Sequence, residues 1–107
     1  LLPDPRIMML DEPVSALDLH HQMQLMEHLC QQTREQQWIT LVVLHDLNLA
    51  AQFADQLILL SGGDLQVCAP PAQVLDADLI ERLYQVPVQI SHDQSGIPFL
   101  RTLRRQS

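Results

Sequence analysis

Lysine is absent from this chain of 107 residues, and glycine occurs at only three positions, Gly62, Gly63 and Gly96. A loop that cradles the phosphates of a nucleotide needs several glycines together with a lysine that reaches the β- and γ-phosphates. The two shortages therefore exclude a complete phosphate-binding loop from this chain. If the protein handles a nucleotide, other polypeptide must hold most of the phosphates.

Positive charge is scarce, and long apolar runs are missing. Six arginines stand against thirteen acidic residues, and the net charge is −7. Proteins that bind nucleic acid neutralise its phosphates with lysine and arginine, so we expect no nucleic-acid partner. No apolar run approaches the roughly 20 residues that span a bilayer, and the N-terminus shows no secretory signal pattern. We therefore expect a cytoplasmic chain in which Cys30 and Cys68 stay reduced.

The first 45 residues carry the pattern of a strand, a helix and a second strand. A run of four apolar residues predicts a strand over 6–11 that is buried on both faces, as in parallel sheets. Asp18 is expected to cap a helix with apolar residues at spacings of three and four, and the polar run 31–37 is expected to end it. A second buried strand is expected over 38–44. Such a unit keeps its two strands parallel.

Smaller elements are expected after His45. Asp46 can cap a short helix over 48–54, and the pair Gly62-Gly63 between two apolar runs is a hairpin signal. Further elements are expected over 70–75 (a helical turn), 77–84 (a short helix) and 86–90, with a turn at 93–96. The predicted fold class is α/β, with parallel strands and a crossover helix followed by a hairpin and short helices.

Three chemically active residues follow the two predicted parallel strands. Asp11 and Glu12 close the first strand, and His45 follows the second. Because ligands of open α/β sheets bind at the carboxyl ends of strands, we expect these side chains to share one site. Taken singly, each residue would be an ordinary turn or loop residue, and it is their joint occurrence that favours phosphoryl transfer to water. Asp11 would hold Mg²⁺ through a water, Glu12 would orient or deprotonate the attacking water, and His45 would donate a hydrogen bond to the γ-phosphate.

The motifs around these residues resemble those of one family. Asp11-Glu12-Pro13, followed by Ser15-Ala16-Leu17-Asp18, resembles the Walker B motif and D-loop of ATP-binding-cassette (ABC) ATPases, although Val14 stands where the family usually has Thr or Ser. The run Leu44-His45-Asp46-Leu47-Asn48-Leu49-Ala50-Ala51 is similar to the H-loop of subunits that import iron–siderophore complexes, haem or cobalamin. Asp18-Leu19-His20-His21-Gln22 and the tail with Ile97-Pro98 also resemble that branch.

The resemblance covers the whole chain and implies a partial P-loop NTPase fold. Residues 1–107 would form the C-terminal part of a single nucleotide-binding domain, with the Walker A motif, Q-loop and signature motif expected upstream of Leu1. The start at Leu1 without a methionine agrees with that expectation. The segment Leu60-Ser61-Gly62-Gly63 copies the first letters of the signature motif, but the flanking apolar runs predict a hairpin turn there.

The resemblance also implies cofactors and partners. ATP and Mg²⁺ would be the cofactors, and the subunit would form a homodimer on the cytoplasmic face of an integral membrane permease. An extracytoplasmic substrate-binding protein would take part indirectly. Asp18 would reach across the dimer interface toward the nucleotide site of the second ATPase subunit. The expected function is ATP hydrolysis in an importer of an iron–siderophore complex, haem or cobalamin, while the fragment alone is expected to be inactive.

Two alternative functions stay open from the sequence. A non-transport ABC ATPase head, as in DNA repair, shares the Asp-Glu-Pro pattern but fits poorly with a net charge of −7. A truncated gene product without catalytic activity is the second alternative. A metal site on the predicted helix is disfavoured, because His20, His21 and His28 are not spaced three or four residues apart.

Overall fold

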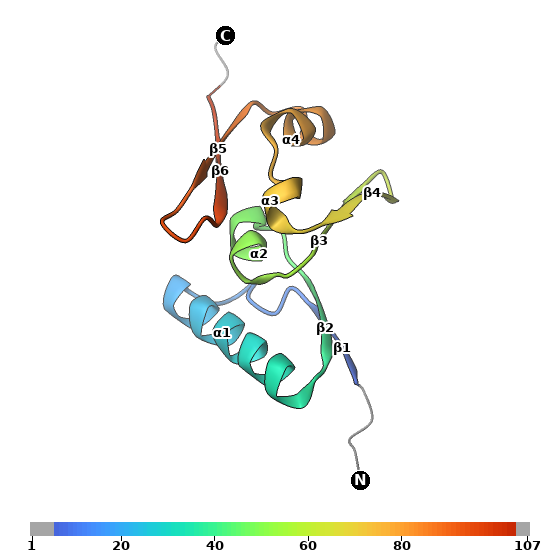
Figure 1. Cartoon of the computed structure of the whole chain (residues 1–107), viewed down its shortest axis with the longest axis vertical. Coiled ribbons are helices and arrows are strands. Elements are labelled where there is room, and N and C mark those ends of the chain that lie inside the picture. Colours follow the sequence, from blue (N-terminus) through green and yellow to red (C-terminus); the bar gives the residue numbers. More distant parts are fainter. Residues whose placement is uncertain (1–5, 105–107) are drawn as a thin grey trace. The chain divides into compact units, whose positions relative to one another are not determined.

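The computed structural model describes residues 6–104, which divide into two compact units at the peptide bond between His45 and Asp46 (Figure 1). The division places both predicted parallel strands, and every candidate site residue, in the first unit. Each unit is described by itself below. None of the helices in residues 6–104 has the length and apolar character needed to cross a bilayer.

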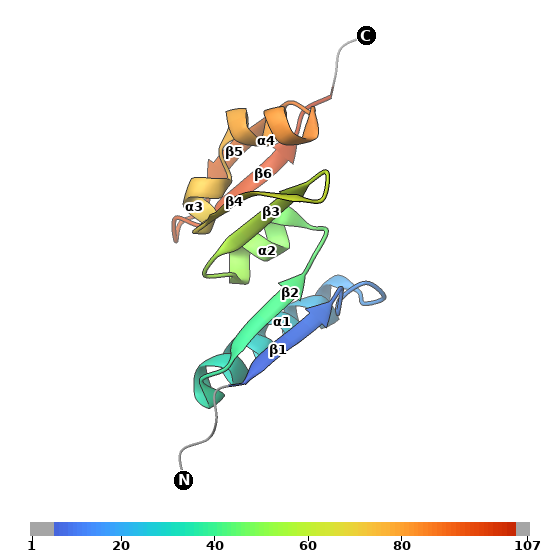
Figure 2. The same ribbon diagram turned by 90° about the vertical axis from the view of Figure 1, so that its right-hand side faces the viewer.

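The first unit is the expected strand–helix–strand arrangement. It contains β1 (Ile7–Asp11), α1 (Leu19–Gln36) and β2 (Ile39–Val43). The two strands pair in parallel, and their register begins with Ile7 opposite Ile39. Helix α1 lies along one face of this pair (Figure 2). The predicted parallel βαβ unit is therefore confirmed.

The burial predicted for these two strands is wrong. Along both strands exposed and partly buried residues alternate, and Ile7 and Met9 keep 68% and 73% of their surface exposed. The apolar side chains exposed on β2 are Ile39, Leu41 and Val43. A strand is buried on both faces only where helices cover both sides of the sheet. Within the described residues of this unit only α1 packs on the strands, so one apolar face stays open.

Helix α1 also extends further than predicted. The polar run 31–37 was expected to end it, yet the helix continues to Gln36. Glutamine, glutamate and arginine are good helix formers, and the side chain of Gln31 donates to Glu35 one turn later at 3.0 Å. The helix ends instead at Gln37, which adopts the left-handed conformation with φ of 56°.

The second unit contains short helices and two antiparallel hairpins. Its elements are α2 (Leu47–Phe53), β3 (Leu57–Ser61), β4 (Asp64–Ala69), α3 (Pro71–Val74), α4 (Ala77–Tyr84), β5 (Val88–His92) and β6 (Pro98–Thr102). The β3–β4 hairpin turns at Gly62 and Gly63, which have φ of 61° and 82°. That finding confirms the predicted turn, and no helix starts there. The β5–β6 hairpin turns near Gly96, where φ is 82°.

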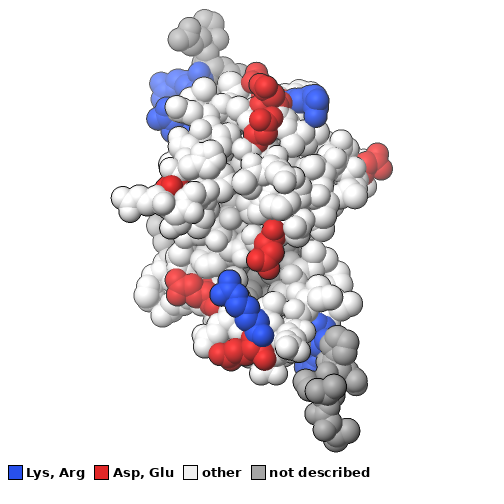
Figure 3. Space-filling view, in the orientation of Figure 1, with Lys and Arg blue, Asp and Glu red and all other residues white. Residues whose placement is uncertain are grey.

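The main hydrophobic core of the described residues belongs to the second unit. Helices α2 and α4 and strands β3 and β5 all contribute side chains to it, and Val74 and Ile80 are almost fully enclosed. Its buried members are Ala51, Leu57, Leu59, Val74, Leu75, Ile80 and Val88. On the face drawn in Figure 3, acidic and basic side chains occur singly or in small groups on each unit.

Candidate functional site

The parallel pairing of β1 with β2 positions the candidate site. Asp11 lies opposite Val43 at the end of the ladder. One residue further on, the backbone N–H of Glu12 donates to the carbonyl of Val43 at 2.9 Å. His45 follows Val43 by two residues, so the segments after β1 and after β2 leave the sheet at the same edge. This placement follows from the topology that the sequence predicted.

Glu12 and His45 meet at this edge. The Oε1 atom of Glu12 and the Nε2 atom of His45 form a close carboxylate–imidazole pair. The two side chains differ in exposure, with 27% of the Glu12 side chain and 85% of the His45 side chain accessible. Oε1 itself is buried, and no hydrogen bond of regular geometry satisfies it in the described part of the chain. The pair thus consists of a buried carboxylate oxygen and an imidazole that solvent and ligands can reach.

The backbone at Glu12 is unusual. Its φ of 50° lies in the left-handed region, which glutamate rarely adopts. The turn that follows is held by the N–H of Ser15, which donates to the carbonyl of Glu12 at 3.2 Å. Val14, the residue that departs from the family pattern, is buried with 8% of its surface exposed. A valine here therefore contributes packing in place of a hydroxyl group.

Asp11 lies at the end of β1 and is exposed. Within residues 6–104, no hydrogen bond or ion pair occupies its carboxylate, so the carboxylate is open to water or to a hydrated cation. No group of three or more His, Cys, Asp or Glu side chains that could hold a metal ion occurs in that part of the chain. Mg²⁺ commonly takes one or two carboxylates, with nucleotide phosphates and waters as its other ligands. The donors present fit Mg²⁺ that arrives with a nucleotide.

Asp18 caps helix α1, as predicted. Its Oδ1 atom accepts from the backbone N–H of His21 at 2.9 Å and contacts the His21 Nδ1 atom at 2.7 Å. These contacts, first the backbone hydrogen bond and then the side-chain one, lower the pKa of the Asp18 carboxyl below its ordinary value. The carboxylate therefore already has partners within its own chain. Its predicted role at a dimer interface stays a prediction.

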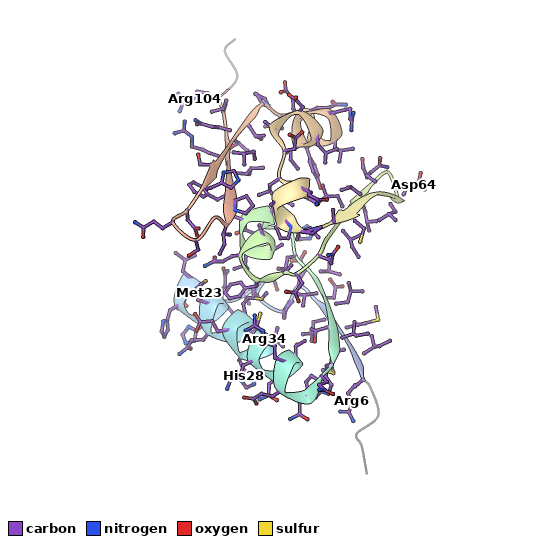
Figure 4. All side chains as sticks on the ribbon, viewed as in Figure 1. Arg6, Met23, His28, Arg34, Asp64 and Arg104 are labelled. Carbon is purple, nitrogen blue, oxygen red and sulfur yellow. The ribbon has the colours of Figure 1, made fainter. Side chains whose placement is uncertain are left out.

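The sequence interpretation missed His21 as the partner of Asp18. A residue three positions after an N-cap often interacts with the cap, and this spacing could have revealed it. His20, His21 and His28 are all exposed. Figure 4 labels His28 on α1, the helix of the first unit. His21 alone among these three has a carboxylate partner in the described residues.

Comparison with known proteins identifies similar sequences. The chain is 46% identical over 95 residues to a hemin import ATP-binding protein of Photobacterium damselae subsp. damselae, a match that covers 88% of this chain and 36% of that protein. It is 42% identical over 99 residues to the protein of the same name from Vibrio vulnificus, with 92% and 38% covered. The chain thus spans just over a third of the length of these relatives. No family model matches it.

A solved structure has the same fold. It is an inward-facing conformation of a metal-chelate type ABC transporter, which superposes with a TM-score of 0.73. The match covers 94% of this chain and 41% of the transporter chain, at 21% sequence identity. The fold class expected from the sequence is therefore confirmed.

Proposed function

Because this chain belongs to the family of ABC transporter ATP-binding subunits, we propose that it supplies part of the ATP-hydrolysing site of an importer. The cargo would be an iron–siderophore complex, haem or cobalamin. Similarity to hemin import proteins favours haem within that group. The subunit would act as a homodimer on the cytoplasmic face of an integral membrane permease, which an extracytoplasmic binding protein supplies with cargo.

The observation that carries the proposal is the meeting of Glu12 with His45. Hydrolysis of ATP transfers a phosphoryl group to water, so the protein must position the water and stabilise charge on the phosphate oxygens. The Glu12 carboxylate would orient the attacking water and accept its proton. The exposed imidazole of His45 would donate a hydrogen bond to the γ-phosphate. Both groups start from one edge of the sheet, within reach of one another.

Asp11 would hold Mg²⁺ through a water. Charge that develops on the β- and γ-phosphate oxygens is neutralised by this ion when it is bound. The exposed position of the Asp11 carboxylate supports this assignment. Asp18 would lie toward the second subunit of the dimer, at the start of helix α1.

A single substitution tests the catalytic role of Glu12. In the full-length subunit that carries this sequence, Glu12→Gln keeps the shape of the side chain but removes its ability to accept a proton. We expect ATP binding to persist while the turnover rate falls by about a hundredfold or more. Turnover is measured as phosphate release, and binding as retention of labelled ATP.

Glu27→Gln is the matched control for this experiment, because Glu27 is an exposed glutamate on α1 outside the site. Its turnover should equal that of the unmodified subunit. Unchanged hydrolysis by Glu12→Gln would remove Glu12 from the role of base. A subunit that hydrolyses no ATP in any form would contradict the proposed function as a whole.

A further inference from the structure

Asn48 links two segments that lie far apart in the sequence. Its side-chain Nδ2 donates to the carbonyl of Leu100 at 2.9 Å, and the N–H of Leu100 donates to its Oδ1 at 2.6 Å. Fifty-two positions separate the two residues. The amide therefore occupies both backbone groups of one residue in β6, much as a neighbouring strand would do. Both residues are partly buried, which protects these hydrogen bonds from competition by water.

Asp46 caps the first turn of the same helix. The Oδ1 atom of Asp46 accepts from the N–H groups of Asn48 at 2.9 Å and Leu49 at 3.2 Å. Helix α2 has only seven residues, and a helix of this length is not stable without tertiary contacts. The cap and the link to β6 therefore hold the first turn of α2, in addition to the burial of Leu49 and Ala51 on the same helix.

His45 immediately precedes this capped turn. It is joined to Asp46 at the peptide bond where the two units meet in the sequence. The side chain of His45 is 85% exposed, and its pair with Glu12 is the side-chain contact described above. Because His45 and Asp46 share a peptide bond, a displacement of the first turn of α2 would also displace the backbone of His45.

We propose that Asn48 is a positioning residue for His45, because it anchors the first turn of α2 to Leu100 of the β5–β6 hairpin. This inference rests on the proposed function, in which His45 contacts the γ-phosphate. It assigns the C-terminal hairpin a part in hydrolysis, although the hairpin carries no candidate catalytic residue. Loss of the link would leave ATP binding largely intact and would misplace the imidazole in the transition state.

The test uses the full-length subunit with Asn48→Ala, His45→Ala and the double variant. We expect Asn48→Ala to lower kcat about tenfold while KM for ATP changes less than about twofold. In the His45→Ala background the same substitution should cause no further loss, because it acts through the imidazole. Gln52→Ala, at an exposed position of α2, is the matched control and should leave kcat unchanged.

A conservative variant separates positioning from general damage to the fold. Asn48→Asp keeps an oxygen that can accept from the N–H of Leu100, but it loses the donor to the Leu100 carbonyl. Its kcat should fall between that of the unmodified subunit and that of Asn48→Ala. If the losses of kcat in Asn48→Ala and His45→Ala multiply in the double variant, the inference is overturned, because Asn48 would then act independently of His45.

Hydrogen exchange supplies a readout that does not depend on ATP hydrolysis. In Asn48→Ala, the amides of residues 44–49 should exchange faster than in the Gln52→Ala control. Faster exchange confined to residues 98–102 would overturn the inference while leaving the proposed function intact. If the unmodified subunit proves inactive, the proposed function fails and the positioning role of Asn48 fails with it.

Discussion

At the scale of single residues, Glu12 combines a candidate catalytic side chain with a strained backbone. A left-handed φ costs a residue with a side chain about 1–2 kcal/mol, and Glu12 adopts one at 50°. Pro13 follows directly, and a proline normally drives the preceding residue toward extended conformations. Strained residues of this kind concentrate at functional sites. The hydrogen bond from the Glu12 N–H to Val43 is one contact that holds this conformation.

The charge of Asp18 makes the stability of helix α1 depend on pH. The pKa of this carboxyl is lowered from its ordinary value of 3.8, first by the backbone N–H of His21 and then by its side chain. A depressed pKa in the folded state stabilises the fold above the unfolded pKa, and this contribution is lost as pH falls through the folded pKa. Asp18→Asn keeps a capping oxygen but carries no charge.

We therefore expect Asp18→Asn to be less stable than the unmodified protein above about pH 5, with the difference disappearing below the lowered pKa. The measurement is the urea midpoint of the full-length subunit as a function of pH. Asp55→Asn, at an exposed position outside the helices, serves as the control. A stability difference that persists unchanged into strong acid would contradict this account.

At the scale of elements, the C-terminal end of α1 offers a test of backbone strain. Gln37 occupies the left-handed position at which helices commonly carry glycine. Gln37→Gly should raise the free energy of unfolding by about 0.5–1 kcal/mol, because glycine adopts this conformation without strain. Chemical denaturation of the full-length subunit measures the change.

Gln24→Gly is the matched control for the end of the helix. Gln24 is exposed in the interior of the same helix. There glycine should lower the free energy of unfolding by roughly 1 kcal/mol. Two changes of the same sign would show that the left-handed cap does not govern the effect.

The elements differ in how far the sequence could predict them. Helix α4 has the predicted bounds, because Asp76 supplies a side-chain cap to the N–H of Leu79 and the apolar residues share one face. The predicted end of α1 was wrong, because the polar residues that suggested a loop are also good helix formers. The meeting of Glu12 with His45 followed from parallel strand topology. The link from Asn48 to Leu100 joins residues 52 positions apart, and no local pattern indicates it.

At the scale of the whole molecule, the two units differ in how much core they enclose. The second unit has the seven-residue buried cluster. In the described part of the first unit, only Val14 and Met26 are buried apolar residues. The first unit instead exposes an apolar strand face formed by Ile7, Met9, Ile39, Leu41 and Val43. The sequence pattern correctly indicated that these strands are apolar. An apolar strand face is buried, however, only where other polypeptide packs against it.

This apolar strand face predicts how the 107-residue chain behaves by itself. Exposed, flat apolar strands favour association between copies and bind hydrophobic dyes. We expect the isolated chain to self-associate and to enhance the fluorescence of an apolar dye. The double variant Met9→Thr with Ile39→Thr should reduce both, because threonine suits a strand but is polar. Light scattering and dye titration measure the two effects.

The control changes an apolar side chain of the other unit. Leu65→Thr alters β4, where Leu65 is 62% exposed, and leaves β1 and β2 unchanged. It should reduce self-association less than the double variant, because it removes one apolar side chain of the β3–β4 hairpin and leaves the exposed Leu60 opposite it in place. A chain that stays monomeric and binds no dye would show that the strand face is shielded in solution. An equal reduction of self-association by Leu65→Thr would show that the surface responsible for association lies on the second unit instead.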